Sequence, residues 1–407
     1  MYKEVNGGVC APKGFKAAGI HCGVKGDGNT AKKDLALIVS DTECAAAGTF
    51  TTNKVKAAPV YLSMKNVADG RAKAIVCNSG NANACAPEGD ENALRMCGET
   101  AKILGIEPEK VLVASTGVIG HTLNIGAILK GLPEAAEKLS EDGGEDAAHA
   151  IMTTDTVMKQ VSVEVELSGK PVRIGGIAKG SGMIHPNMGT MLSFLTTDAA
   201  IEAPLLQKLL KDCVRVTFNR ISVDGDTSTN DTCLILANGL AGNASLEEGS
   251  ADCEVFRDAL EYVCRTLAVT MAKDGEGATK LITCTVTGAA DENKAEVIAK
   301  SVIRSPLVKT AMFGSDANWG RVLCAMGYSG EDFDPLKVDV GFSSRAGSID
   351  VCTGGRGLEF DEDRALKVLS EDEVVIDITM REGDAAVTAW GCDLTYDYVK
   401  INGDYRT

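Results

Sequence analysis

The sequence predicts a mixed α/β fold with two closely packed lobes. Short apolar runs that end in Gly or polar residues alternate with amphipathic stretches, which is the pattern of buried strands and the helices that cover them. The strictly alternating segment QVSVEVEL (160–167) indicates a half-buried strand, and strand-like runs dominate the C-terminal part of the chain. No internal repeat or low-complexity tract interrupts this pattern.

The individual elements follow from the same periodicities. Strands are predicted at 33–41, 71–80, 109–117, 336–342, 347–352, 373–380 and 384–392. Helices are predicted at 89–104, 203–216, 251–272 and 289–304. Charge, Gly and Ser concentrate at 139–147 and 241–251, which are expected to be loops. The stretch GMIHPNMGTMLSF (182–194) is too apolar for a surface linker and too rich in Gly and Pro for a helix or a central strand.

Composition and charge exclude several classes of function. The chain has 407 residues, 44% of them hydrophobic, and a formal net charge of −16. Nucleic acid and anionic membrane surfaces would repel such a chain, and no basic stripe offsets the charge. No apolar run reaches the roughly 18 residues of a transmembrane helix, and the N-terminus lacks the apolar centre of a signal peptide. We therefore expect a cytoplasmic protein whose 14 Cys are mostly buried thiols.

The common catalytic and cofactor motifs are missing. The four His (His21, His121, His149 and His185) lie in no hydrolase or metalloprotease motif, and they never cluster with Cys as zinc ligands do. The Gly-rich run AKGSGM (178–183) lacks the pattern of a phosphate-binding loop. We therefore expect no metal and no cofactor. A loop His such as His185 is more often structural, but it is the alternative base if Thr190 is a nucleophile.

Two Thr–Gly features remain as candidate chemistry. Thr116–Gly117 follows an apolar strand, where the hydroxyl group and backbone amides can stabilise an oxyanion or simply form a tight turn. Gly189 precedes Thr190, whose hydroxyl is a weak nucleophile without a base. Cleavage of that peptide bond would expose an α-amino group with a pKa near 8, which can act as the base without any His.

The chain resembles the ornithine acetyltransferase family, the bifunctional glutamate N-acetyltransferases/amino-acid acetyltransferases of arginine biosynthesis. The resemblance extends over essentially the whole chain. Its carriers are GFKAAGIHCGVK (14–25), KDLALI (33–38), FTTNKVKAAPV (50–60), NSGNANAC (78–85), ASTGVIG (114–120), MTTDT (152–156), AKGSGMIHPNMGTML (178–192), SVDGDTSTNDT (222–232), AKDGEGATK (272–280), GSDANWGRV (314–322) and INGDYRT (401–407).

The resemblance implies a precursor that cleaves itself between Gly189 and Thr190. The products would be an α chain, 1–189, and a β chain, 190–407, which begins with the nucleophile. The family usually has Ala before this Thr, so Gly189 is a mild departure. The implied fold is a mixed-sheet αββα sandwich shared with self-processing aminopeptidases, and the implied assembly is a dimer of αβ units.

The implied reaction moves an acetyl group from N2-acetylornithine to glutamate through an acetyl-Thr190 ester. Thr116 and Gly117 match the oxyanion hole. Acetyl-CoA is left open as a second acetyl donor. Substrate contacts carry over by match to Thr153, Lys179, Thr190, Glu276, Asn402 and Thr407.

Several assignments stay open at this stage. Thr154 competes with Thr153 for the substrate contact, and Glu276 is a hypothetical partner of the ornithine ammonium. Asp224 and Asp226 are expected to hydrogen-bond a turn rather than bind a cation. A self-processed amidase or aminopeptidase would use the same Thr190 but pass the acyl group to water. A non-catalytic homologue that only binds amino acids is disfavoured because Thr116, Gly117 and Thr190 are all present.

Overall fold

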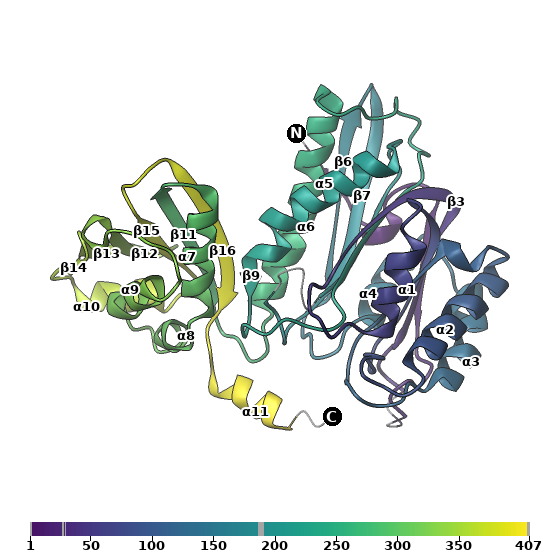
Figure 1. Cartoon of the computed structure of the whole chain (residues 1–407), viewed down its shortest axis with the longest axis horizontal. Coiled ribbons are helices and arrows are strands. Elements are labelled where there is room, and N and C mark those ends of the chain that lie inside the picture. Colours follow the sequence, from purple (N-terminus) through teal and green to yellow (C-terminus); the bar gives the residue numbers. More distant parts are fainter. Residues whose placement is uncertain (1, 27, 29, 186–190, 405–407) are drawn as a thin grey trace.

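The computed structural model describes residues 2–26, 28, 30–185 and 191–404, and it divides into two lobes (Figure 1). The larger lobe holds a nine-stranded mixed sheet and the smaller lobe a seven-stranded one. Both sheets combine parallel and antiparallel pairs. The predicted mixed α/β class with two lobes is therefore confirmed.

In the larger lobe the strands follow the order β1-β6-β7-β8-β10-β3-β4-β5, with β2 added beside β3. Their bounds are β1 (Lys3–Glu4), β2 (Phe15–Ile20), β3 (Leu35–Phe50), β4 (Arg71–Asn78), β5 (Val111–Ser115), β6 (Lys159–Leu167), β7 (Lys170–Lys179), β8 (Leu192–Thr197) and β10 (Thr232–Ala237). The long strand β3 pairs with β2 through its first half and with β10 through its second half. Its pairing with β4 extends from Leu35 to Ala45 and shifts register between Val39 and Cys44.

This bend folds the sheet into two facing layers with helices outside. Helices α5 (Ala203–Val216) and α6 (Ala251–Lys273) share one core with β6 and β7. Helices α2 (Gly89–Leu104) and α3 (Ile125–Glu137) share another with β3, β4 and β5. A third core lies between the layers and includes Ile75 from one side and Phe194 from the other. Three successive cores are the signature of an αββα sandwich, as predicted.

Two shorter helices complete this lobe. Helix α1 (Ala58–Asn66) packs against β5 and α2, and α4 (Gly144–Ala150) packs against β2 and enters the core between the layers. Short 3-10 turns cover Gly8–Cys10, Pro108–Lys110, Phe218–Arg220 and Pro335–Lys337 across the whole chain.

The smaller lobe has the strand order β14-β13-β12-β15-β11-β16-β9. The strands are β9 (Ile221–Ser222), β11 (Leu281–Ala289), β12 (Asp339–Ser344), β13 (Gly347–Thr353), β14 (Arg356–Gly357), β15 (Glu373–Thr379) and β16 (Ala385–Cys392). Its core is shared with the helices α7 (Glu292–Arg304), α8 (Pro306–Phe313), α9 (Trp319–Gly327) and α10 (Glu362–Leu369).

Several contacts join the lobes. Strand β9, which leaves the larger lobe after α5, pairs with β16 of the smaller sheet. Arg220 forms ion pairs with Glu292 and Glu296 of α7. After β16 the chain returns as α11 (Tyr396–Asp404), which approaches the larger lobe from below in Figure 1.

Several predicted elements have the expected bounds, and three expectations are wrong. Helices 89–104 and 203–216 match α2 and α5. The predicted loop 139–147 contains the start of α4. Acidic residues precede the buried Ala residues of this helix and gave the segment the composition of a loop. The predicted strand 33–41 continues to Phe50, because small Ala residues extend it without clear alternation.

The third error concerns 182–194. Residues 192–194 begin β8, which is a central strand with all six residues buried. The Gly and Pro residues that argued against a strand precede it in sequence. The final strands are otherwise close to prediction, as 373–380 is β15 and 384–392 is β16.

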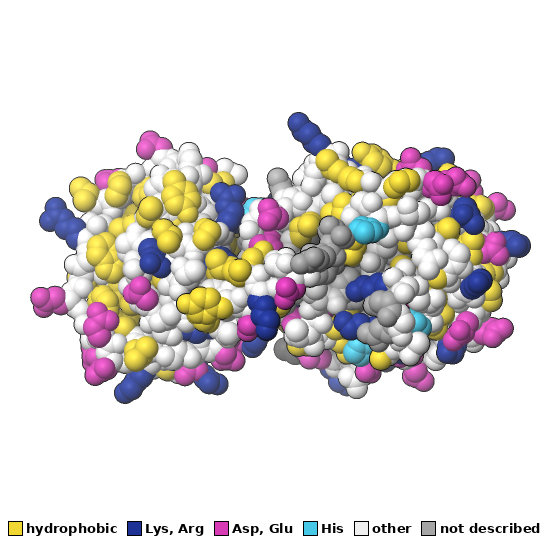
Figure 2. All heavy atoms as spheres, turned by 90° about the horizontal axis from the view of Figure 1, so that it is seen from below, with side chains coloured by type: hydrophobic (Ala, Val, Ile, Leu, Met, Phe, Trp, Pro, Cys, Tyr) yellow, Lys and Arg dark blue, Asp and Glu magenta, His cyan; other side chains and the backbone are white. Residues whose placement is uncertain are grey.

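Other features agree with the composition. All 14 Cys are free thiols, and only Cys85 and Cys324 are exposed. Figure 2 shows acidic and basic side chains scattered over both lobes on the face seen from below, where the basic ones form no continuous stripe. Within the described part of the chain, no helix is long and apolar enough to cross a membrane.

Candidate active site

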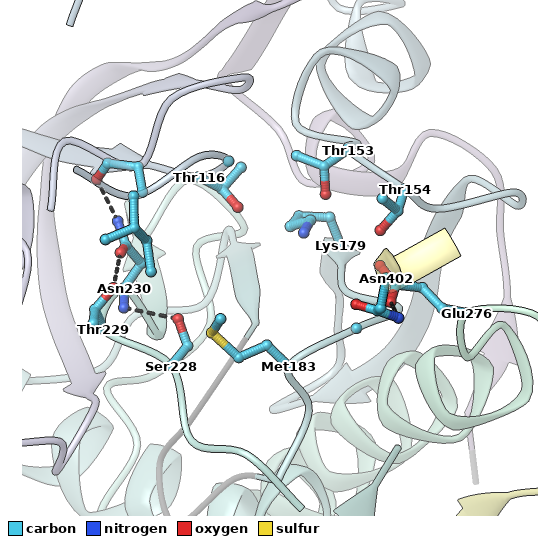
Figure 3. Close-up of a pocket in the computed structure, with 14 residues that line it drawn as sticks. Thr116, Thr153, Thr154, Lys179, Met183, Ser228, Thr229, Asn230, Glu276 and Asn402 are labelled. Atoms are coloured by element: carbon cyan, nitrogen blue, oxygen red, sulfur yellow. Dashed lines mark hydrogen bonds between the residues drawn. The ribbon is translucent and has the colours of Figure 1, made fainter. Parts of the chain in front are cut away.

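One cavity, of about 120 Å³, brings together most of the residues singled out from the sequence (Figure 3). Its lining is Ala82, Thr116, Gly117, Ile119, Thr153, Thr154, Lys179, Gly182, Met183, Ser228, Thr229, Asn230, Glu276 and Asn402. Every predicted site residue that the structure describes is among them. Gly189, Thr190 and Thr407 lie outside the described residues.

Thr116 and Gly117 lie in a constrained loop after β5. Gly117 has φ +132°, and an added Cβ would come within 2.3 Å of the Gly80 carbonyl carbon, so no other residue fits there. The Thr116 amide already donates to the Asn78 carbonyl oxygen at 3.0 Å. The hydroxyl group of Thr116, and not its backbone amide, is therefore the donor that this residue offers to a ligand.

Buried Asn side chains hold this loop in place. The side-chain Nδ2 of Asn78 donates to the Asn81 carbonyl oxygen, and the Ser115 hydroxyl donates to Asn78 Oδ1 at 2.6 Å. Asn230 Nδ2 donates to the carbonyl oxygens of Ala82 and Ser115 at 2.6 and 2.8 Å. Asn230 thus connects the segment before β10 to Ser115, which precedes the Thr116–Gly117 loop, and to Ala82. These bonds make the cavity rigid.

Lys179 ends β7 and is the cation of the cavity lining, with a side chain that is only 8% exposed. Figure 3 shows it between Thr116 and Thr154, with the Thr153 hydroxyl pointing toward it. Its Nζ lies 3.8 Å from Asp155 Oδ2. Burial alone would raise the pKa of Asp155, but the charges of Lys179 and Lys159 outweigh that effect and hold the pKa well below its usual range.

Glu276 brings a carboxylate to the cavity. It follows α6, and its amide donates to the Ser181 carbonyl oxygen at 2.8 Å. Asn402 Nδ2 of α11 donates to Glu276 Oε2 at 2.8 Å. A Cβ on Gly182 would lie 2.3 Å from the Glu276 carboxyl carbon, so the glycine makes room for this carboxylate.

Asp224 supports the loop that carries Gly182, as expected for a turn-forming carboxylate. It accepts hydrogen bonds from the amides of Met183 and Ile184 at 2.6 and 2.9 Å. Tyr398 of α11 donates to the same carboxylate. The described residues contain no cluster of three acidic, His or Cys side chains that could hold a metal ion.

The start of β8 is flanked by residues of the cavity. Lys179 lies opposite Leu192 in the β7–β8 pair, and Thr232 opposite Leu192 in the β8–β10 pair. The Thr232 amide also donates to the Met191 carbonyl oxygen at 3.0 Å. The sheet therefore brings Lys179 and Asn230, two residues before Thr232, to the start of β8, which follows Thr190 in the sequence.

His185 does not line the cavity. Its Nδ1 lies 3.1 Å from Ser222 Oγ, near the junction of the lobes. Burial, together with the charges of Lys300 and Arg304, lowers its pKa to about 4. This environment suits a neutral structural imidazole better than a base for Thr190.

Seven lining residues were not predicted as site residues: Ala82, Ile119, Gly182, Met183, Ser228, Thr229 and Asn230. The last three lie in the motif SVDGDTSTNDT, so the motif itself was the available signal. Thr154 joins Thr153 in the lining, and its hydroxyl group bonds to Ser181 Oγ at 2.7 Å. Both threonines are therefore placed for a ligand contact.

A cavity with hydroxyl groups, a rigid loop that requires Gly117, one lysine and one glutamate is suited to acyl transfer on a small amino-acid-like substrate. The chain belongs to the ArgJ family, whose model matches residues 16–407. The family predicted from the sequence is thereby confirmed.

Individual relatives agree along the full length. The chain is 54% identical over 404 residues to the arginine biosynthesis bifunctional protein ArgJ of Caldanaerobacter subterraneus subsp. tengcongensis, with 99% of each chain covered. It is 47% identical over 406 residues to the protein of the same name from Bacillus subtilis, covering 99% of this chain and 98% of the relative. A crystal structure of ArgJ from Bacillus halodurans matches with 47% identity and a TM-score of 0.51, over 53% of this chain and 99% of that one.

Gly182→Ala tests the close approach of Glu276. The added methyl group must displace the carboxylate, and we expect activity to fall about 10- to 100-fold because displaced groups no longer align with substrate. Steady-state acetyl transfer and thermal melting are the measurements. Gly98→Ala is the matched control, since nothing lies within 4 Å of its added Cβ in α2. Unchanged activity in Gly182→Ala would show that Glu276 does not need its present position.

His185 predicts a pH dependence of stability. Its pKa falls from 6.5 to about 4 on folding, so the unfolded chain binds a proton in this interval that the folded chain does not. Stability contributed by neutral His185 is therefore complete above pH 6.5 and is lost as pH falls toward 4. In urea titrations the wild type should lose more unfolding free energy than His185→Gln between these pH values. Parallel pH profiles would refute the assignment.

Proposed function

We propose that this chain transfers the acetyl group of N2-acetylornithine to glutamate, after it cleaves itself between Gly189 and Thr190. The observation that carries the proposal is the position of the cavity at the start of β8. Lys179 of β7 and Asn230 before β10 border the cavity and flank the strand that follows Thr190. The activity fits the names of the curated relatives, which are arginine biosynthesis bifunctional proteins.

Self-cleavage begins with attack of the Thr190 hydroxyl on the Gly189 carbonyl carbon. The C–N bond breaks, an ester forms on Thr190, and the released amine takes the proton. Water then hydrolyses the ester and leaves a Gly189 carboxylate. In support, the Bacillus halodurans chain is 99% covered by a match to 53% of this chain, so it has about the length of the fragment 190–407.

The fragments would stay associated after cleavage. Strand β7 belongs to 1–189 and pairs with β8 of 190–407 through six residue pairs. Strand β3 likewise pairs with β10 across the boundary. The two segments therefore belong to one folded unit and are not separate folding domains. We extend the proposal to a dimer of such αβ units.

In turnover the free α-amino group of Thr190 serves as the base for its own hydroxyl group. The hydroxyl attacks the acetyl carbon of N2-acetylornithine, and the Thr116 hydroxyl and Gly117 amide stabilise the oxyanion. Ornithine leaves with the proton, and the amine of glutamate then takes the acetyl group from Thr190. Neither step uses a metal or a cofactor. Acetyl-CoA, as a second donor, would load the same threonine.

The charged residues of the cavity suit amino-acid substrates. Lys179 and the hydroxyl group of Thr153 hold a substrate carboxylate, and Glu276 holds the ornithine ammonium. Asn402, which bonds to Glu276, brings α11 to the same site. Thr407 is kept as a proposed substrate contact because the family resemblance implies it.

Intact mass spectrometry of the wild type, Thr190→Ala and Thr190→Ser tests the proposal. The wild type should give fragments of 189 and 218 residues. Thr190→Ala should remain a single chain of 407 residues and transfer no acetyl group. Thr190→Ser should again give the two fragments. N-acetylglutamate should form only with glutamate present. Acetate formation without glutamate would identify an amidase instead. Full transfer by an uncut chain would refute the N-terminal base.

A further inference from the structure

Lys159, the first residue of β6, is a buried cation that the mechanism above does not use. Its side chain is 0% exposed and is one of the largest fully buried side chains of the protein. A lysine is rarely buried in this way without partners, because removing an ammonium group from water is strongly unfavourable. Its partners therefore indicate what it does.

Three acceptors satisfy the Lys159 ammonium group. Its Nζ donates to Asp155 Oδ1 at 2.8 Å, to Asp274 Oδ2 at 2.5 Å and to the Val157 carbonyl oxygen at 3.1 Å. An ammonium group has three N–H donors, so all are used. Lys159 thus joins two carboxylates that come from distant parts of the sequence.

Each carboxylate organises backbone of the cavity wall. Asp155 accepts the amides of Thr153 at 3.0 Å and Gly180 at 2.7 Å, which fixes the segment of Thr153 to the end of β7. Asp274 accepts the amides of Thr156 and Val157 and the Thr156 hydroxyl.

Asp274 also precedes a lining residue by two positions. Glu276 follows it in the turn after α6 and is bonded through its amide to Ser181. The network thus joins three segments that bring Thr153, Lys179 and Glu276 to the cavity.

The charges of this cluster balance. Lys159 and Lys179 are opposed by Asp155 and Asp274, and Asp155 lies between the two lysines, at 2.8 Å from Lys159 Nζ and 3.8 Å from Lys179 Nζ. Because Lys159 makes the shorter contacts with the carboxylates, Asp155 does not draw Lys179 into a close ion pair. Lys179 keeps donors for a ligand in the cavity.

We propose that Lys159 is a positioning residue for the amino-acid substrates: it ties the segments of Thr153 and Glu276 together and leaves Lys179 available to bind a substrate carboxylate. The inference deepens the proposed function and rests on it for the identity of the ligands. Lys159 itself touches no substrate, since it is fully buried and lies outside the cavity lining.

Loss of Lys159 alone would leave two buried carboxylates with a single remaining lysine, which is strongly destabilising. The double variant Lys159→Met/Asp274→Asn avoids this because it removes one charge of each sign. Lys179 and Asp155 then remain as a pair, and Asp155 is free to draw the Lys179 ammonium away from the cavity. The segment of Glu276 also loses its link to that of Thr153.

Calorimetric titration of ornithine and of glutamate into wild type, Asp274→Asn and the double variant tests this inference. We expect the dissociation constants of the double variant to rise about 10- to 100-fold, as for misplaced substrate-binding groups. The single variant Asp274→Asn, which retains Lys159, should bind closer to wild type. Tighter binding by the single variant than by the double variant is a result that a merely structural role of Lys159 would not give.

Lys280→Met is the matched control. Lys280 is also a buried ammonium with three acceptors, the carbonyl oxygens of Met312 and Leu369 and the Ser315 hydroxyl, and none of these residues lines the cavity. Its loss should lower the melting temperature without changing either affinity. Wild-type affinities in Lys159→Met/Asp274→Asn would overturn the inference.

Two further outcomes are informative. If the double variant does not fold, Asp155→Asn replaces the ion pair of Lys159 with Asp155 by at most a neutral hydrogen bond and removes one acceptor oxygen that holds the Thr153 segment. It should weaken binding of both ligands, and unchanged binding overturns the inference. If the wild type binds both amino acids but transfers no acetyl group, the proposed function fails while the comparison of affinities still decides the role of Lys159. A wild type that binds neither amino acid overturns both.

Discussion

The position of β8 between β7 and β10 is the constraint on which the site depends. Its six residues are all buried, and both neighbours are fixed by complete hydrogen-bonded ladders. A shift of register by one residue would turn every side chain of the strand to the opposite face, so the alternating burial against two cores excludes it. Lys179 and Asn230 therefore reach the cavity at the same end of the sheet, next to the start of β8.

Around that strand the structure uses residues that permit close approach and residues that prevent movement. Gly117 and Gly182 are sites where any Cβ would collide with a backbone carbonyl or with Glu276. Asn230 and Asp155 act in the opposite sense, because each side chain joins backbone segments that are distant in sequence. A rigid polar cavity of this kind is suited to stabilise charge that develops during acyl transfer, since its donors need not reorganise.

The sequence predicted the fold class and the surface helices well, because amphipathic periodicity is local. Helices α2 and α5 match their predicted bounds for this reason. It also predicted Thr116, Gly117, Thr153, Lys179, Glu276 and Asn402 as site residues through the family resemblance, and the structure places all six in one cavity. What the sequence alone could not predict depends on contacts over long separations. Asp274 is 115 residues from Lys159, so no local sequence pattern around either residue indicates that the two form an ion pair. Helix α4 was missed because its acidic residues are typical of a loop. Its Ala residues are small and are identified as core residues only by their contacts in the core between the layers.

The central claim is that Thr190 carries the acetyl group between the two substrates. The most direct measurement is intact and peptide mass spectrometry of the protein after incubation with N2-acetylornithine and without glutamate, followed by acid quenching. The account predicts that the fragment beginning at Thr190 gains one acetyl group on that residue as ornithine is released, and that glutamate removes it as N-acetylglutamate. Release of an equivalent amount of ornithine from an unmodified fragment, or acetylation of another residue, would contradict it.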